Sequence, residues 1–208
     1  MDFYDAIYTR RTVREFLDKE VDPDAVQRIL AAGFAAPTWN HRRNWHFIVL
    51  GRENDRGAVF GFAKKTADAF DAERYLKIPR PYPVTLGQKM YAHALPRQFT
   101  MLAKAPSVVI PVFRAKDVGG GSFSKLNPFA TIWCCVENIF LAATAEGLAC
   151  SMRIPMDEEH EEVKKALKVP ATYRLPVFIG IGHADPGEPP LEQDAPDWGK
   201  QVHYGSWK

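Results

Sequence analysis

Apolar positions at spacings of three and four predict the helices of this chain. One helix is expected over 22–36, with Asp22 as its cap, and the widest apolar face belongs to a helix over 129–147. A mostly polar helix should cover 52–70. A charged helix over 157–168 has the acid-to-base order that the helix dipole favours, and its charges suit a solvated face. A short N-terminal helix should bury one apolar side, formed by Phe3, Ile7 and Tyr8.

Short continuous apolar runs predict buried strands at 45–50, 106–113 and 175–182. Helices and strands interleave without regular alternation and without an internal repeat. This order predicts an α+β fold with a mixed central sheet flanked by helices, in one domain over 1–208.

The region over 66–96 is expected to be an inserted lid or excursion. Three prolines within 77–83 exclude a helix interior or a central strand there, because proline lacks the backbone N–H. The following helix, over 90–104, should be interrupted at Pro96. Glycines at 119–121 predict a mobile loop, and the tail over 185–208 shows no clear element.

The composition excludes several classes of protein. The 208 residues include 27 Lys+Arg and 25 Asp+Glu, a net charge of +2, which disfavours a dedicated nucleic-acid binder. No apolar run approaches the roughly 18–20 residues that span a membrane, and the N-terminus lacks the basic start of a signal peptide, so we expect a cytoplasmic protein. Three cysteines, Cys134, Cys135 and Cys150, are expected to be reduced and buried. Ligand spacings for a metal site are not found.

Two segments carry candidate chemistry. Arg10, Arg11 and Arg14, with the hydroxyl of Thr12, offer fork-shaped donors for a phosphate, although a solvated basic turn is the alternative. The loop within 36–47 joins a helix to a strand and displays Thr, Asn, His and Arg side chains. Its tryptophans and arginines also permit a nucleic-acid-binding module. Rossmann, P-loop and G-x-S-x-G motifs do not occur, which disfavours dinucleotide binding of those kinds and nucleophilic hydrolysis.

Four motifs in order resemble the FMN-dependent nitroreductase family. They are R-R-[ST]-[VI]-R-x-F at 10–16, A-P-[ST] followed by W-x-F within 36–47, a long helix ending A-x-x-x-G-L within 131–148, and L-P-V-x-I-G-x-G at 175–182. The resemblance implies a homodimer in which the long helices pack together, two FMN molecules lie at the interface, and the C-terminal tail is extended.

The resemblance also implies cofactor-binding residues. Arg10, Arg11 and Thr12 would meet the FMN phosphate and ribityl chain, and Arg14 the N1–O2 edge of the ring. The partner subunit would supply the loop 37–41, and the segment 153–155 would pass the ring near N5. In full, the predicted residues are Arg10, Arg11, Thr12, Arg14, Pro37, Thr38, Trp39, Asn40, His41, Gln98, Arg153, Ile154, Pro155 and Lys200. Beyond the flavin itself, no catalytic residue and no metal is assigned.

This chain departs from the family pattern at two positions. Arg43 stands where the family often has Gln, and Lys200 is the nearest cation for completing the phosphate site from the tail. The expected function is an oxidoreductase in which NADH or NADPH reduces FMN and a nitroaromatic, quinone or similar small acceptor reoxidises it by a ping-pong mechanism. The alternatives are a dedicated reaction on the same fold (reductive dehalogenation, ene reduction or flavin-linked oxidation) and, from another class, the nucleic-acid-binding module.

Overall fold

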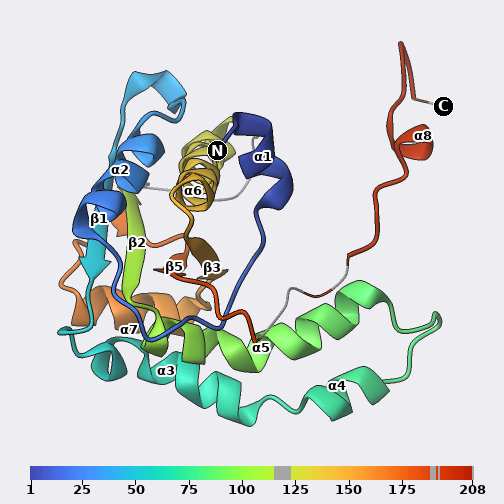
Figure 1. Ribbon diagram of the computed structural model, residues 1–208, viewed down its shortest axis with the longest axis horizontal. Helices are drawn as coiled ribbons and strands as arrows, with labels where there is room; N and C mark the ends of the chain where they lie inside the picture. The colour runs from blue at the N-terminus through green and yellow to red at the C-terminus, as the bar shows by residue number, and fades with distance from the viewer. Residues whose placement is uncertain (115–122, 188–190, 192, 208) are drawn as a thin grey trace.

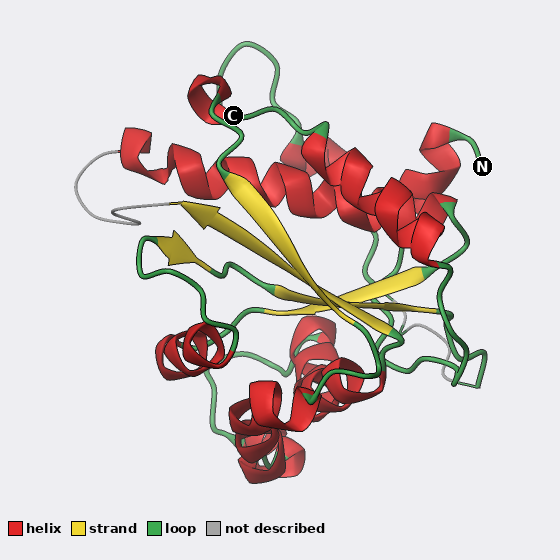
Figure 2. Ribbon diagram, turned by 90° about the vertical axis from the view of Figure 1, so that its left-hand side faces the viewer, coloured by secondary structure: helices red, strands yellow, loops and turns green. Residues whose placement is uncertain are grey.

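The computed structural model describes residues 1–114, 123–187, 191 and 193–207. A five-stranded sheet lies between two layers of helices (Figure 2). Its strands run in the order β1-β2-β5-β3, and β4 pairs with β2 beside this path. The strand bounds are Trp45–Leu50 for β1, Ser107–Arg114 for β2, Ala149–Arg153 for β3, Tyr173–Arg174 for β4 and Phe178–Gly182 for β5. The α+β prediction is confirmed.

Every ladder between these strands is antiparallel, whereas a mixed sheet was expected. Parallel pairing occurs in an isolated bridge between Thr12 and Cys150. The backbone N–H of Val13 donates to the Cys150 carbonyl at 3.0 Å. The arginine-rich segment is therefore held along β3, the end strand of the sheet, and this contact positions its side chains.

One face of the sheet is covered by α2 (Pro23–Phe34) and α6 (Asn127–Ala145), and α1 (Phe3–Thr9) lies beside α6 (Figure 1). The long α6 buries Ile132, Ile139 and Phe140 against the sheet and α2. Gly147 ends the turn after α6 at a φ of +73°, a conformation that glycine adopts without strain. The helical segment 123–145 is long and apolar enough to cross a membrane by length and composition, but its buried residues belong to this core.

The other face is covered by α3 (Arg56–Ala69), α5 (Leu86–Lys104) and α7 (Asp157–Ala166). α5 begins at a capping box formed by Thr85 and Gln88 and continues through Pro96, so the expected interruption is wrong. α4 (Ala72–Lys77) packs against α5, and the proline-rich residues 78–84 connect the two. At this contact the ring centroids of Phe70, Tyr75 and Tyr91 lie 5.4 to 6.3 Å apart. The role of this helical excursion as a lid stays a prediction.

Three expectations about burial are corrected. The apolar side of α1 is exposed, with Phe3 at 64% and Tyr8 at 70%, because the helix faces the core through Ala6 alone. Cys134 is also exposed, whereas Cys135 and Cys150 are buried, and all three are free. The charged helix α7 is not fully solvated, since Glu159 is completely buried.

The C-terminal tail leaves the body of the molecule and contains a short helix, α8 (Trp198–Gln201) (Figure 1). Trp198, Tyr204 and Trp207 of this tail are exposed. Two further single-turn elements, η1 (Trp39–His41) and η2 (Phe123–Leu126), precede β1 and α6. The glycine loop expected at 119–121 lies outside the described residues.

Candidate active site

A cavity of about 310 Å³ lies between the arginine-rich segment, α5 and the tail. We call it the Arg14 cavity. Residues 11–15 form one wall, and Tyr91, Ala94 and Gln98 of α5 line another. Leu191 and Gln193 contribute from the tail. The structure thus brings four predicted residues together from distant parts of the chain: Arg11, Thr12, Arg14 and Gln98.

Two guanidinium groups lie close together in the Arg14 cavity. Burial lowers the pKa of Arg14, and the nearby charge of Arg97 lowers it further. Nε of Arg14 is buried without a hydrogen-bond partner among the described residues. Arg97 donates to the His93 carbonyl at 3.1 Å and lies 3.7 Å from the carboxylate of Glu15. A buried, unpaired donor beside a second cation favours an acceptor or anion in this space.

A buried ion pair contacts Gln98, one of the residues that line the cavity. Nε of Arg153 donates to Oε1 of Glu159 at 2.7 Å, and Nη1 of Arg153 donates to Oε1 of Gln98 at 2.8 Å. Arg153 and Glu159 are 4% and 0% exposed. The side chain of Arg153 is therefore committed to protein partners, and its contribution to a ligand in the Arg14 cavity passes through Gln98, which it orients.

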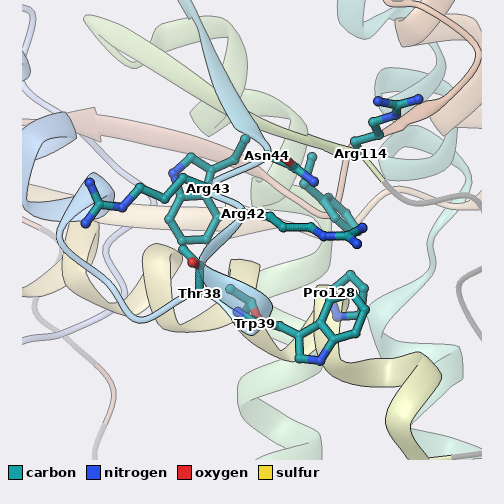
Figure 3. A pocket seen from close by; sticks show the side chains of 10 residues that line it. Thr38, Trp39, Arg42, Arg43, Asn44, Arg114 and Pro128 are labelled. Atoms are coloured by element: carbon teal, nitrogen blue, oxygen red, sulfur yellow. The ribbon is translucent and has the colours of Figure 1, made fainter.

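The loop before β1 forms a second cavity, of about 430 Å³, which we call the Trp39 cavity (Figure 3). Thr38 and Trp39 line it, whereas Asn40 and His41 are exposed on the loop. Asn40, His41 and Arg43 all have positive φ values, between 42° and 54°. Such conformations cost energy for residues other than glycine, and they mark a loop held in a specific shape. The backbone N–H of Trp39 donates to Oγ1 of Thr131, which ties the loop to α6.

The remaining predicted residues lie elsewhere in the single chain. Arg10 ends α1 and lies 3.6 Å from Glu137 of α6, and Pro37 is exposed before the loop. Ile154 and Pro155 line a third hollow with His160 of α7. Lys200 is in the tail and pairs with Asp197 at 2.8 Å. One chain therefore gathers only part of the predicted set.

Sequence reasoning missed several residues of these sites, among them Arg97, Arg114, Glu159 and His160. Glu159 sits on the helix whose charges were expected on a solvated face, and Arg97 sits on a helix in which no motif marks it. His160 accepts from the Leu175 backbone N–H at 3.1 Å and contacts Glu161 at 2.9 Å. A helical projection of α7 could have found Glu159, because Glu159 and Val163 share its buried face.

Comparisons with known proteins place this chain in a family. The family model described as "Nitroreductase family" matches residues 7–183. A candidate NADH dehydrogenase/NAD(P)H nitroreductase of Archaeoglobus fulgidus is 36% identical over 206 residues, covering 97% of this chain and 96% of its own.

Two solved structures are similar in fold. An FMN- and NADPH-dependent nitroreductase variant from Sphigopyxis sp. strain HMH has a TM-score of 0.73 at 18% identity, covering 100% of both chains. Iodotyrosine deiodinase bound to FMN and 3-iodo-L-tyrosine has a TM-score of 0.73 at 18% identity, covering 99% of this chain and 100% of its own. The family match spans most of the chain, including all four motifs and the core of the sheet, and on this ground the protein belongs to the nitroreductase family.

Proposed function

We propose that this protein is an FMN-dependent oxidoreductase that takes electrons from NADH or NADPH and passes them to a small, electron-poor acceptor such as a nitroaromatic or quinone. The observation that carries the proposal is the buried, unpartnered Nε of Arg14 in a cavity that also holds Arg11, Thr12 and Gln98. Family membership supports the same reaction class. The names of the Archaeoglobus relative and of the nitroreductase from Sphigopyxis, quoted above, support NAD(P)H and FMN as its partners.

The residues present fit FMN by their donor chemistry. Arg11 and Thr12 offer charged and hydroxyl donors to phosphate and ribityl oxygens. Arg14 would direct its free N–H and its positive charge toward the pyrimidine edge, and Gln98 offers an amide there. Glu15 is the one carboxylate among the lining residues, and it faces Arg97.

Bound FMN would supply the two-electron chemistry between the nicotinamide and the acceptor. The chain itself would bind FMN, orient its ring and stabilise the negative charge that develops there. Arg14, largely removed from water, would stabilise negative charge that develops on the ring, because a fixed cation acts strongly at low dielectric. The Arg153–Gln98 hydrogen bond would keep the amide in one orientation. Both substrates would use the same cavity in turn, which predicts ping-pong kinetics with parallel double-reciprocal plots.

We further infer that two copies assemble to complete the site. The apolar side of α1 is exposed beside α6, and so are the aromatic residues of the tail. Exposed apolar groups of this extent favour an interface. The loop 37–41 and the Arg14 cavity form separate sites in one chain, as they would if each loop served the partner's flavin. Pro37, Thr38, Trp39, Asn40, His41, Arg10, Ile154, Pro155 and Lys200 stay predicted ligands in this dimer.

The test combines a spectrum with a variant. Arg14→Gln keeps a planar donor but removes the charge, so it should weaken FMN binding and slow anaerobic reduction by NAD(P)H. The expected loss of affinity is roughly 10- to 100-fold, the effect of one charge-assisted hydrogen bond. Arg74→Gln, an exposed residue of α4 outside the cavity, is the matched control. Equal FMN affinity in both variants would contradict the assignment of Arg14.

A dedicated reaction on the same fold is the second candidate. Tyr91 and neighbouring residues of α5 line the Arg14 cavity, so the excursion contributes directly to whatever binds there. This favours a shaped site over a generic one. Turnover with nitrofurazone and menadione separates the two, because a dedicated dehalogenase, ene reductase or oxidase should be slow with both. We also propose a cytoplasmic location and no nucleic-acid partner, and a salt-dependent shift of single-stranded DNA would contradict the latter.

A further inference from the structure

The Trp39 cavity contains charge that the proposed flavin contacts do not use. Ten residues line it, and they include Arg42, Arg43 and Arg114 but no carboxylate. Across the described part of the chain, these three arginines take part in no ion pair, in contrast to Arg10, Arg28, Arg52, Arg97 and Arg153. A concentration of unneutralised guanidinium groups in one hollow favours an anion.

Two of these arginines are brought together by the sheet. The backbone N–H of Arg114 donates to the Asn44 carbonyl at 3.0 Å, which extends the β1–β2 ladder by one step beyond Trp45. Arg42 precedes Asn44 by two residues, and its guanidinium carbon lies 5.4 Å from the centre of the Trp39 ring. In Figure 3, the guanidinium groups of Arg42 and Arg114 lie toward the right of the view, and Arg43 extends to the left.

A buried indole adds a further donor among the residues that line the cavity. Trp45 lines the cavity and is 4% exposed, yet its indole Nε1 has no hydrogen-bond partner among the described residues. Pro128 and Thr131, from the first turns of α6, also line the cavity.

We propose that the Trp39 cavity binds the oxyanion group of a small molecule, a carboxylate or a phosphate, between Arg42 and Arg114. The planar guanidinium groups suit bidentate contact with either oxyanion. Trp39, Phe113 and Pro128 provide flat apolar surface for the rest of the molecule. This inference deepens the proposed function and rests on it. The cavity shares Thr38 and Trp39 with the predicted flavin loop, so the bound anion would be part of a substrate that reacts with the flavin.

Two kinds of substrate could supply the oxyanion. One is an aromatic acceptor that carries a carboxylate, and the other is NADPH, whose 2′-phosphate distinguishes it from NADH. Calorimetric titration of the FMN-loaded protein with benzoate and with adenosine 2′-monophosphate separates them, and benzyl alcohol and adenosine serve as neutral controls. Binding of one anion, with no heat from its neutral counterpart, is the expected result.

Variants connect the binding to the cavity. Arg42→Gln and Arg114→Gln should each weaken binding of the preferred anion roughly 10- to 100-fold, as expected for one lost charge-assisted contact. Arg74→Gln controls for the loss of one positive charge elsewhere. Turnover gives a second measure: KM for 4-nitrobenzoate, or for NADPH, should rise while KM for 4-nitrobenzyl alcohol, or for NADH, stays within threefold.

Three results would overturn the proposal. The first is that neither anion binds. The second is that the Arg42 and Arg114 variants bind the anion as tightly as the unaltered protein does. The third is that these variants lose FMN instead, which would make the arginines part of the flavin site. A protein that binds the anion but never binds FMN would contradict the proposed function and leave anion binding at the cavity intact. The two failures are therefore distinguishable.

Discussion

Breaking the Arg153–Glu159 pair should destabilise the protein strongly, because both side chains are buried. The joined atoms are 2.7 Å apart, and the side chains are 4% and 0% exposed. At an effective dielectric of about 20 their attraction is about 6 kcal/mol, most of it offset by the cost of removing both charges from water. Removing one partner leaves the other buried and unpaired, which costs about 3–5 kcal/mol.

Glu159→Gln is the sharpest form of this perturbation, because it preserves volume while removing the charge. It also weakens the acceptor for the Met156 backbone N–H, which lies 3.3 Å from Oε2. We expect a loss of about 3 kcal/mol in the free energy of unfolding, at the lower end of that range. Urea unfolding followed by circular dichroism, at one protein concentration and with excess FMN, measures it.

The double variant R153M/E159M provides the matched comparison. Replacing both charges with apolar side chains should recover most of the lost stability, since no buried charge remains. The double variant should not restore the orientation of the Gln98 amide, because the hydrogen bond from Arg153 is lost. A loss below 1 kcal/mol in E159Q, or a double variant no more stable than the single one, would refute the reasoning.

Three further predictions concern other buried groups. Arg56 donates to the carbonyls of Leu50, Gly51, Leu102, Ala105 and Pro106. Arg56→Met should therefore cost about 3 kcal/mol or more in the same urea assay, and Arg56→Lys less, because unsatisfied buried carbonyls cost about 1–3 kcal/mol each. Burial lowers the pKa of His160 below that of the unfolded chain. The unfolded state then binds more protons, so stability should fall as pH drops through the ordinary histidine range, and His160→Gln should flatten that slope. Burial raises the pKa of Cys135 to about 12, and Cys150 is raised too, so only Cys134 should react with Ellman's reagent before unfolding; fast labelling that survives Cys134→Ser would contradict this.

Local periodicity was enough to predict most elements. β1 lies at 45–50 as expected, and α6 ends before Gly147 because glycine takes the positive φ that closes the helix. The continuous passage of α5 through Pro96 was not predictable in the same way, since tertiary packing of Met101 and Leu102 against the sheet outweighs the local cost of proline.

The candidate site was predictable only where a motif exists. The arginine-rich segment and the loop at 36–47 were identified from residue type and order, and the structure places Arg11, Thr12, Arg14 and Gln98 around one cavity. Arg97 and Arg114 could not be found, because their roles depend on which helix or strand lies opposite. The pairing of Arg114 with Asn44 is set by the β1–β2 register, which spans more than sixty residues of sequence.

The visible absorption spectrum of the purified protein tests the central claim most directly. Preparation with added FMN, followed by gel filtration to remove free cofactor, should leave a yellow protein with one FMN per chain that is bleached anaerobically by NADH or NADPH. Arg14→Gln should retain less cofactor than Arg74→Gln under the same treatment. A colourless protein that stays free of FMN after this incubation would contradict the account.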